Sequence, residues 1–147
     1  MSRFFKFFNS SKSTDQMEEV VDPIQLATVV LMIEMARADF HQDNLEDQKI
    51  IDLLEHHFDL SHEDVVALFT RGQKKADDSV SLHEFTRTLH TNLSQADKEE
   101  VIGLLWQLAM VDEKLDRYED YLVRKVADLL YVSNTVVLRI RHQVTAK

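Results

Sequence analysis

The sequence contains no cysteine, only two glycines and only one proline in its 147 residues. Without cysteine the chain can form no disulfide, thiolate nucleophile, zinc finger or iron–sulfur cluster. Gly72 and Gly103 cannot supply the fixed glycine spacings of a dinucleotide-binding fingerprint, a P-loop or a nucleophile elbow. The shortage of turn-forming residues also disfavours an all-β fold.

Long apolar segments are missing as well. The uncharged apolar stretch of residues 101–111 is shorter than the roughly 20 residues that cross a bilayer as a helix. The N-terminus shows no long apolar segment followed by a small-residue cleavage site, so we do not expect export. Apolar residues make up 44% of the chain, which is enough for the core of one ordinary domain. These features predict a cytoplasmic globular protein.

Positive charge is scarce in the first half of the chain. The net charge is −9, and residues 15–69 carry 14 acidic residues against only Arg37 and Lys49. Residues 70–147 carry equal numbers of both signs. The imbalance disfavours a nucleic-acid partner, because phosphate binding needs clustered cations. We expect a cation or a basic partner to be drawn to the first half instead.

Residues 1–14 form a basic and aromatic tail that contains three cations and no acid. Its aromatic residues are Phe4, Phe5, Phe7 and Phe8. One interpretation is a disordered start, or phenylalanines that pack onto the domain. The other is a weak peripheral membrane contact, in which the rings enter the headgroup region and the cations meet anionic lipid. Residues 22–147 are expected to form a single helical domain.

Cap residues predict where the helices of this domain begin. Asp22 precedes Pro23, a pairing typical of an N-cap and the first helical position. Ser81 with Glu84 has the pattern of a capping box. The other predicted starts are Asp43, Ser61, Ser94, Asp116 and Ser133. No segment has the alternation of a strand, so the prediction is an all-α bundle of about seven helices.

The first helix, from residue 24 to residue 38, is apolar nearly all round. Such a helix is expected at the centre of a bundle, where it is buried on all sides. Its innermost stripe is predicted to be Ile24, Ala27, Leu31 and Met35.

The chain carries an internal repeat. Moved along by 73 residues, it matches itself at six positions between residues 31 and 57. The identical pairs are Leu31/Leu104, Ala36/Ala109, Asp39/Asp112, Asp43/Asp116, Glu46/Glu119 and Asp47/Asp120. Beyond them the register slips by one, so that Leu60 faces Val132. We therefore predict two pseudo-repeated three-helix units joined by a short helix.

The repeated acids follow the pattern D-x3-D-x2-E-D, for which helix capping is one explanation. Asp43 with Glu46 forms a capping box, and so does Asp116 with Glu119. Acids in a first helical turn also lie favourably in the field of the helix dipole. Capping accounts for these four residues without any ligand.

A cation site is the other explanation, because capping leaves Asp39 and Asp112 unexplained. Each ends an apolar helix, where the dipole opposes a carboxylate, and each faces further acids across a short turn. Clustered carboxylates suit hard ions such as Ca²⁺ or Mg²⁺. The candidate metal ligands are Asp39, Asp43, Glu46, Asp112, Asp116 and Glu119. Lys114 and Arg117 can neutralise the second turn, so the first turn is the better site.

The sequence resembles the tellurite-resistance protein TerB family over roughly residues 24–145. The resemblance rests on Ala36-Arg-Ala38-Asp39 followed by Glu46-x3-Ile50, and more loosely on Ala109-Met-Val111-Asp112 followed by Glu119-x3-Val123. It implies an all-helical fold, a bacterial cytoplasmic location, and a divalent-cation site built by these acids. It also implies work beside membrane-bound partners in tellurite and stress response. Phe40 and Glu113 stand where the family commonly has a glycine after the Asp.

These observations predict a non-enzymatic, TerB-like binding module that acts in the cytoplasm, with a possible peripheral location at the inner membrane face. It is expected to bind a divalent cation and to dock to protein partners at the membrane. An alternative is a metal-free protein-interaction domain whose acids are helix caps. A third is a metal-dependent hydrolase, in which carboxylates and a metal activate water.

Overall fold

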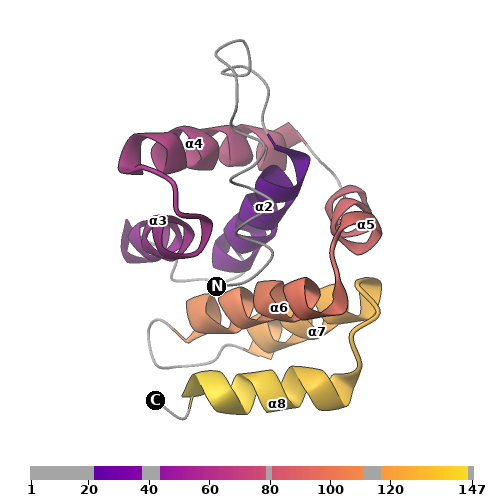
Figure 1. Ribbon diagram of the computed structural model, residues 1–147. Helices are drawn as coiled ribbons and strands as arrows, with labels where there is room; N and C mark the ends of the chain where they lie inside the picture. Colours follow the sequence, from indigo (N-terminus) through magenta and orange to yellow (C-terminus); the bar gives the residue numbers. More distant parts are fainter. Residues whose placement is uncertain (1–21, 38–43, 79–80, 111–116, 146–147) are drawn as a thin grey trace.

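The computed structural model describes residues 22–37, 44–78, 81–110 and 117–145. All regular structure within these ranges is helical, and seven helices are present, which confirms the predicted all-α fold (Figure 1). They are α2 (Pro23–Arg37), α3 (Asn44–Phe58), α4 (His62–Asp78), α5 (His83–Asn92), α6 (Gln95–Ala109), α7 (Arg117–Leu129) and α8 (Asn134–Thr145). Among the described residues, none of these helices combines the length and apolarity needed to span a bilayer.

Side-chain caps fix the start of several helices. The Asp22 Oδ1 atom accepts a 2.8 Å hydrogen bond from the Ile24 backbone N–H at the start of α2. Ser94 caps α6 in the same way by accepting from the Asp97 N–H at 3.2 Å. Equivalent bonds to Ser61 and Ser133 begin α4 and α8. These are the expected acceptors for the unpaired N–H groups of a first helical turn.

The predicted capping box before α5 is wrong in detail. Ser81 accepts from the His83 N–H, only two residues on, and Leu82 is the N-cap residue with no side-chain cap bond. Glu84 lies instead 3.5 Å from the Lys75 ammonium of α4. An ion pair between helices therefore takes the place of the expected bond back to the helix start.

Helix α2 lies at the centre of the molecule and packs against α3, α4, α5 and α6. The four residues of its predicted inner stripe are all buried, with at most 3% of each exposed. Gly72 on α4 brings that helix close, because a Cβ atom there would lie 2.6 Å from Val29 Cγ1. The central position of α2 follows from its lack of a polar face.

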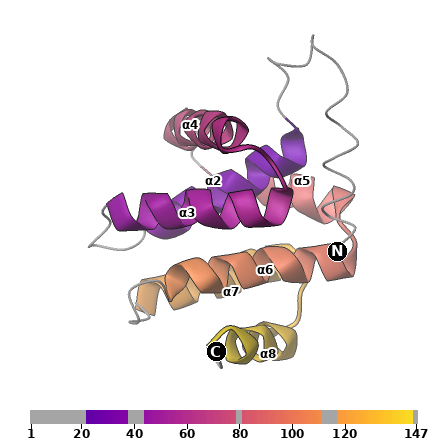
Figure 2. The same ribbon diagram turned by 60° about the vertical axis from the view of Figure 1, so that its left-hand side comes forward.

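The helices stack in layers, with α4 above α2 and α3, then α6 with α7, and then α8 (Figure 2). Helix α5 joins the two halves and packs against α2 and α7. The halves meet where α2 and α3 contact α6.

Two backbone features lie at the spacings of the predicted repeat. Asn44 and Arg117, the first residues of α3 and α7, are 73 positions apart, which is the repeat spacing found in the sequence. Asp59 and Tyr131, which follow α3 and α7, both have a positive φ, 53° and 62°. These two residues are 72 positions apart, as the slipped register requires. Both turns therefore contain a residue in the left-handed conformation, and the duplication itself stays a prediction.

Candidate functional site

Most of the predicted metal ligands lie outside the part of the chain that the structure describes. Asp39, Asp43, Asp112 and Asp116 fall in the gaps between described ranges, and Glu46 lies on α3 but its side chain is not described. Glu119 is the one predicted ligand with a described side chain. The ligand set as a whole therefore stays a prediction.

The described helices do show where the two acidic turns begin and end. The start of α3, the end of α6 and the start of α7 lie on the same side of the molecule, at the left of Figure 2. Helix α3 packs against α6, and α2 packs against both α6 and α7. The helices that flank the two predicted turns are therefore neighbours in space.

Glu119 lies in the first turn of α7 and is only 1% exposed. Burial of a carboxylate is costly unless opposite charge or hydrogen bonds compensate it. The N-terminal end of the helix contributes part of this compensation through its dipole. Carboxylate oxygens are also the donors that hard divalent ions prefer, so the chemistry of Glu119 fits both the capping role and the ligand role.

Asp120, the next residue, belongs to an ion-pair network that was not predicted. Its Oδ2 atom accepts a 2.8 Å bond from Arg124 Nε, and its Oδ1 atom lies 3.8 Å from Arg141 Nη1. The Arg141 guanidinium also lies over the Trp106 ring, 5.5 Å from its centroid. The i,i+4 spacing to Arg124 could have been read from the sequence. The contact with Arg141 could not, because it depends on how α8 packs on α7.

The counterpart of Asp120 in the first half is Asp47, which makes no ion pair within the described ranges. The second acidic turn is thus followed by an acid that two arginines neutralise. The acids of the first turn lie outside the described side chains, so the preference for the first turn stays a prediction from the sequence.

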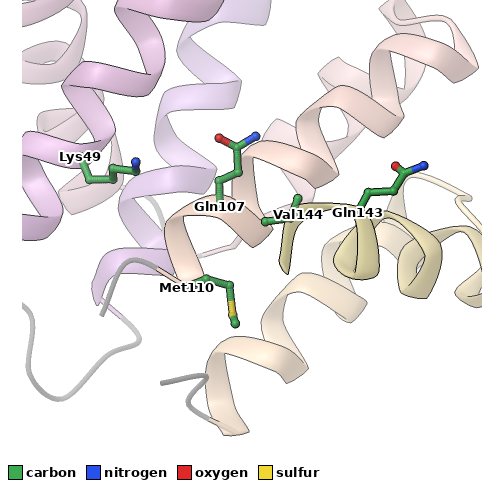
Figure 3. Close-up of a pocket in the computed structure, with 5 residues that line it drawn as sticks. All are labelled: Lys49, Gln107, Met110, Gln143 and Val144. Atoms are coloured by element: carbon green, nitrogen blue, oxygen red, sulfur yellow. The ribbon is translucent and has the colours of Figure 1, made fainter. Parts of the chain in front are cut away.

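A pocket of about 350 Å³ opens between α3, α6 and α8 (Figure 3). Its described lining consists of Lys49, Gln107, Met110, Gln143 and Val144. Met110 is the C-cap residue of α6, so the pocket lies beside the helix end that leads into the second acidic turn. None of these residues was singled out in the sequence. The one available signal was that Lys49 is one of only two cations among residues 15–69.

Histidines and acids elsewhere do not assemble a second candidate centre. No group of three or more His, Cys, Asp or Glu side chains within the described ranges could hold a metal ion. His62 pairs with Glu55 between α4 and α3. Burial lowers the pKa of the half-buried His57, and the neighbouring His56 lowers it further.

Comparison with known proteins gives one family. The family model described as "Tellurite resistance protein TerB" matches residues 25–142. No curated protein and no solved structure gave a significant match.

Proposed function

Because the chain belongs to the tellurite resistance protein TerB family, we propose that it is a non-enzymatic stress-response module of the bacterial cytoplasm. It binds a divalent cation, Ca²⁺ or Mg²⁺, through its acidic turns. It also docks to protein partners at the inner face of the membrane.

The observation that carries the cation proposal is the buried carboxylate of Glu119 at the start of α7. It places one of the repeated acids inside the protein, at the end of the molecule where the helices flanking both turns gather. Asp39 and Asp112 add carboxylates that the helix dipole opposes. An ion bound by these oxygens offsets both the dipole and the mutual repulsion of the acids.

Calorimetric titration with Ca²⁺ and Mg²⁺ tests the proposal, with Asp39→Asn and Asp47→Asn as the matched pair. Both substitutions remove one charge from the same short stretch. Asp39→Asn should weaken cation binding about tenfold or more, because charged contacts are worth about 1.5–3 kcal/mol. Asp47→Asn should change it little. Equal losses in the two variants would show that overall charge, and not a ligand at Asp39, attracts the ion.

The same titration separates the alternatives. Protein that takes up neither ion would be the metal-free interaction domain, with its acids acting as caps. Turnover of generic phosphoester substrates in the presence of the ion would indicate the metal-dependent hydrolase.

We also propose that the tail makes the peripheral membrane contact. Deletion of residues 1–14 should leave the helical circular dichroism signal of the remaining domain unchanged. It should reduce the fraction of protein that sediments with anionic liposomes at low salt. If the full-length protein does not sediment with such liposomes, the membrane contact is ruled out.

A further inference from the structure

Lys49 is a cation in the most acidic part of the chain that has no ion-pair partner within the described ranges. The other cation among residues 15–69, Arg37, pairs with Asp77 at 2.8 Å. Lys49 makes no ion pair or hydrogen bond within the described ranges, although 14 acids lie in the same stretch of sequence. It is half-buried and lines the pocket between α3, α6 and α8. Within the described part of the chain, this ammonium therefore faces the pocket and pairs with no acid.

The rest of the described lining offers neutral hydrogen-bonding groups and apolar surface. Gln107 and Gln143 carry primary amides, each with two N–H donors and one carbonyl acceptor. Met110 and Val144 supply a thioether and a branched methyl surface. In Figure 3 these side chains come from both α6 and α8, with Lys49 reaching in from α3. A volume of about 350 Å³ lies within the range of small-ligand sites.

We propose that this pocket binds a carboxylate group attached to a small apolar group. Lys49 would repel a cation there, and a neutral ligand would leave its ammonium uncompensated. A phosphate dianion carries more charge than one lysine can neutralise in a protein of net charge −9. A carboxylate matches the single ammonium and can accept a hydrogen bond from an amide of the lining, while the lining also offers apolar surface to the group attached to it.

Two sources carry this chemistry: a free organic acid and the C-terminal residue of a peptide. The inference goes beyond the proposed cation binding and does not depend on it. It is therefore tested on the full-length chain dialysed free of divalent cations, so that failure here leaves the cation proposal untouched.

The experiment is an NMR titration of isotope-labelled protein in which the backbone amide resonances of α3, α6 and α8 are monitored. One arm uses N-acetyl-leucine, with N-acetyl-leucinamide as the neutral control. The other uses a leucine-terminated peptide with a free or an amidated C-terminus. We expect saturable shifts around the pocket with a carboxylate probe and none with the matching amide. Tighter binding of the peptide than of N-acetyl-leucine identifies a chain terminus as the source, and tighter binding of N-acetyl-leucine identifies a free acid; either result supports the site.

Lys49→Gln and Lys74→Gln provide the matched variants, because Lys74 is an exposed lysine of α4 that also makes no ion pair within the described ranges. Lys49→Gln should weaken carboxylate binding roughly tenfold or more, whereas Lys74→Gln should leave it unchanged. The proposal is overturned if neither carboxylate probe gives saturable shifts. It is also overturned if the amides bind as well as the acids, or if both variants lose binding equally.

Discussion

Gly72 shows how one absent side chain sets the distance between two helices. A Cβ atom at this position would lie 2.6 Å from Val29 Cγ1 and 3.1 Å from Ile33 Cδ1. Val29 is fully buried and β-branched, so its side chain has few other rotamers to adopt. Helix α4 can therefore approach the central helix only with glycine here.

Gly72→Ala should lower the free energy of unfolding by about 1–2 kcal/mol, because overpacking outweighs the better helix propensity of alanine. Gly103→Ala is the control, since its added Cβ would meet Ile140 Cγ2 at an ordinary 3.7 Å. That variant should gain roughly 0.5–1 kcal/mol from propensity. Urea denaturation of the two variants measures both changes. Stabilisation by Gly72→Ala would show that α4 and α2 are not packed as closely as described.

His57 should make the stability of the protein depend on pH below neutrality. Its pKa is lowered from 6.5, first by burial and then by His56. Below about pH 6.5 the His57 imidazole is therefore protonated in the unfolded chain but stays neutral in the folded protein. The free energy of unfolding should fall as the pH drops through this range towards the lower folded-state pKa.

His57→Gln should remove part of this fall, whereas His142→Gln, at an exposed position of α8, should leave it in place. Burial raises the pKa of Glu34, which gives a dependence of the opposite sign above about pH 4.5. That contribution is common to all three proteins and cancels in the comparison. The measurement is urea denaturation at pH 7.0, 6.0 and 5.5, and identical slopes in the wild type and His57→Gln would contradict the assignment.

At the scale of single residues, the sequence predicted what depends on near neighbours. The caps at Asp22, Ser61, Ser94 and Ser133 were readable because a cap bond joins residues two or three positions apart. The contact of Arg141 with Asp120 joins α8 to α7, and it could not be predicted from the sequence because the two residues are distant along the chain. The same holds for the pocket around Lys49, whose lining comes from three helices.

At the scale of elements, the turn after α7 contains an unusual residue. The Val132 N–H donates to the Ala127 carbonyl at 2.9 Å, which is the bond of a Schellman motif. Tyr131 occupies the left-handed position of this motif, with φ 62°, where glycine or asparagine is normal. Its side chain is 74% exposed and its ring lies 4.5 Å from that of His90. Asp59, at the equivalent turn of the first half, suits the left-handed conformation better.

Tyr131→Asn should therefore raise the free energy of unfolding by about 0.5–1 kcal/mol, because relief of the left-handed strain exceeds the loss of one exposed ring contact. Asp59→Tyr is the reciprocal change and should destabilise the protein by a similar amount. Thermal denaturation of both variants provides the measurement. A loss of stability in Tyr131→Asn would mean that the contact with His90 is worth more than the strain.

The number, order and type of the helices in the described ranges were predictable because caps and apolar periodicity are local signals. The apolar circumference of α2 also predicted its central position, which its burial confirms. The start of α5 was misplaced, because the pair between Lys75 and Glu84 depends on how two helices lie in space. The turn residues Asp59 and Tyr131 carry no glycine signal, so their positive φ values were not expected.

At the scale of the whole molecule, α2 and α3 pack against α6. The repeat in the sequence predicts two similar halves, which stays a prediction, but it does not predict this contact surface. That surface brings the start of α3 close to the end of α6, and hence the flanks of the two acidic turns to one side of the protein. The proposed cation site and the pocket around Lys49 both depend on this arrangement.

The central claim is that the acidic turns bind a divalent cation and do more than cap helices. Four melting curves test it most directly: the wild type and Asp43→Ser, each with and without Ca²⁺. Serine keeps an N-cap acceptor but removes a ligand charge, so the two cation-free proteins should melt at nearly the same temperature. A hundredfold excess of Ca²⁺ over Kd should stabilise the wild type by about 2.7 kcal/mol, a rise in Tm of roughly 5–11 °C. Asp43→Ser should lose most of that rise. A wild type whose Tm responds to neither Ca²⁺ nor Mg²⁺ at millimolar concentration would contradict the claim and leave capping as the role of these acids.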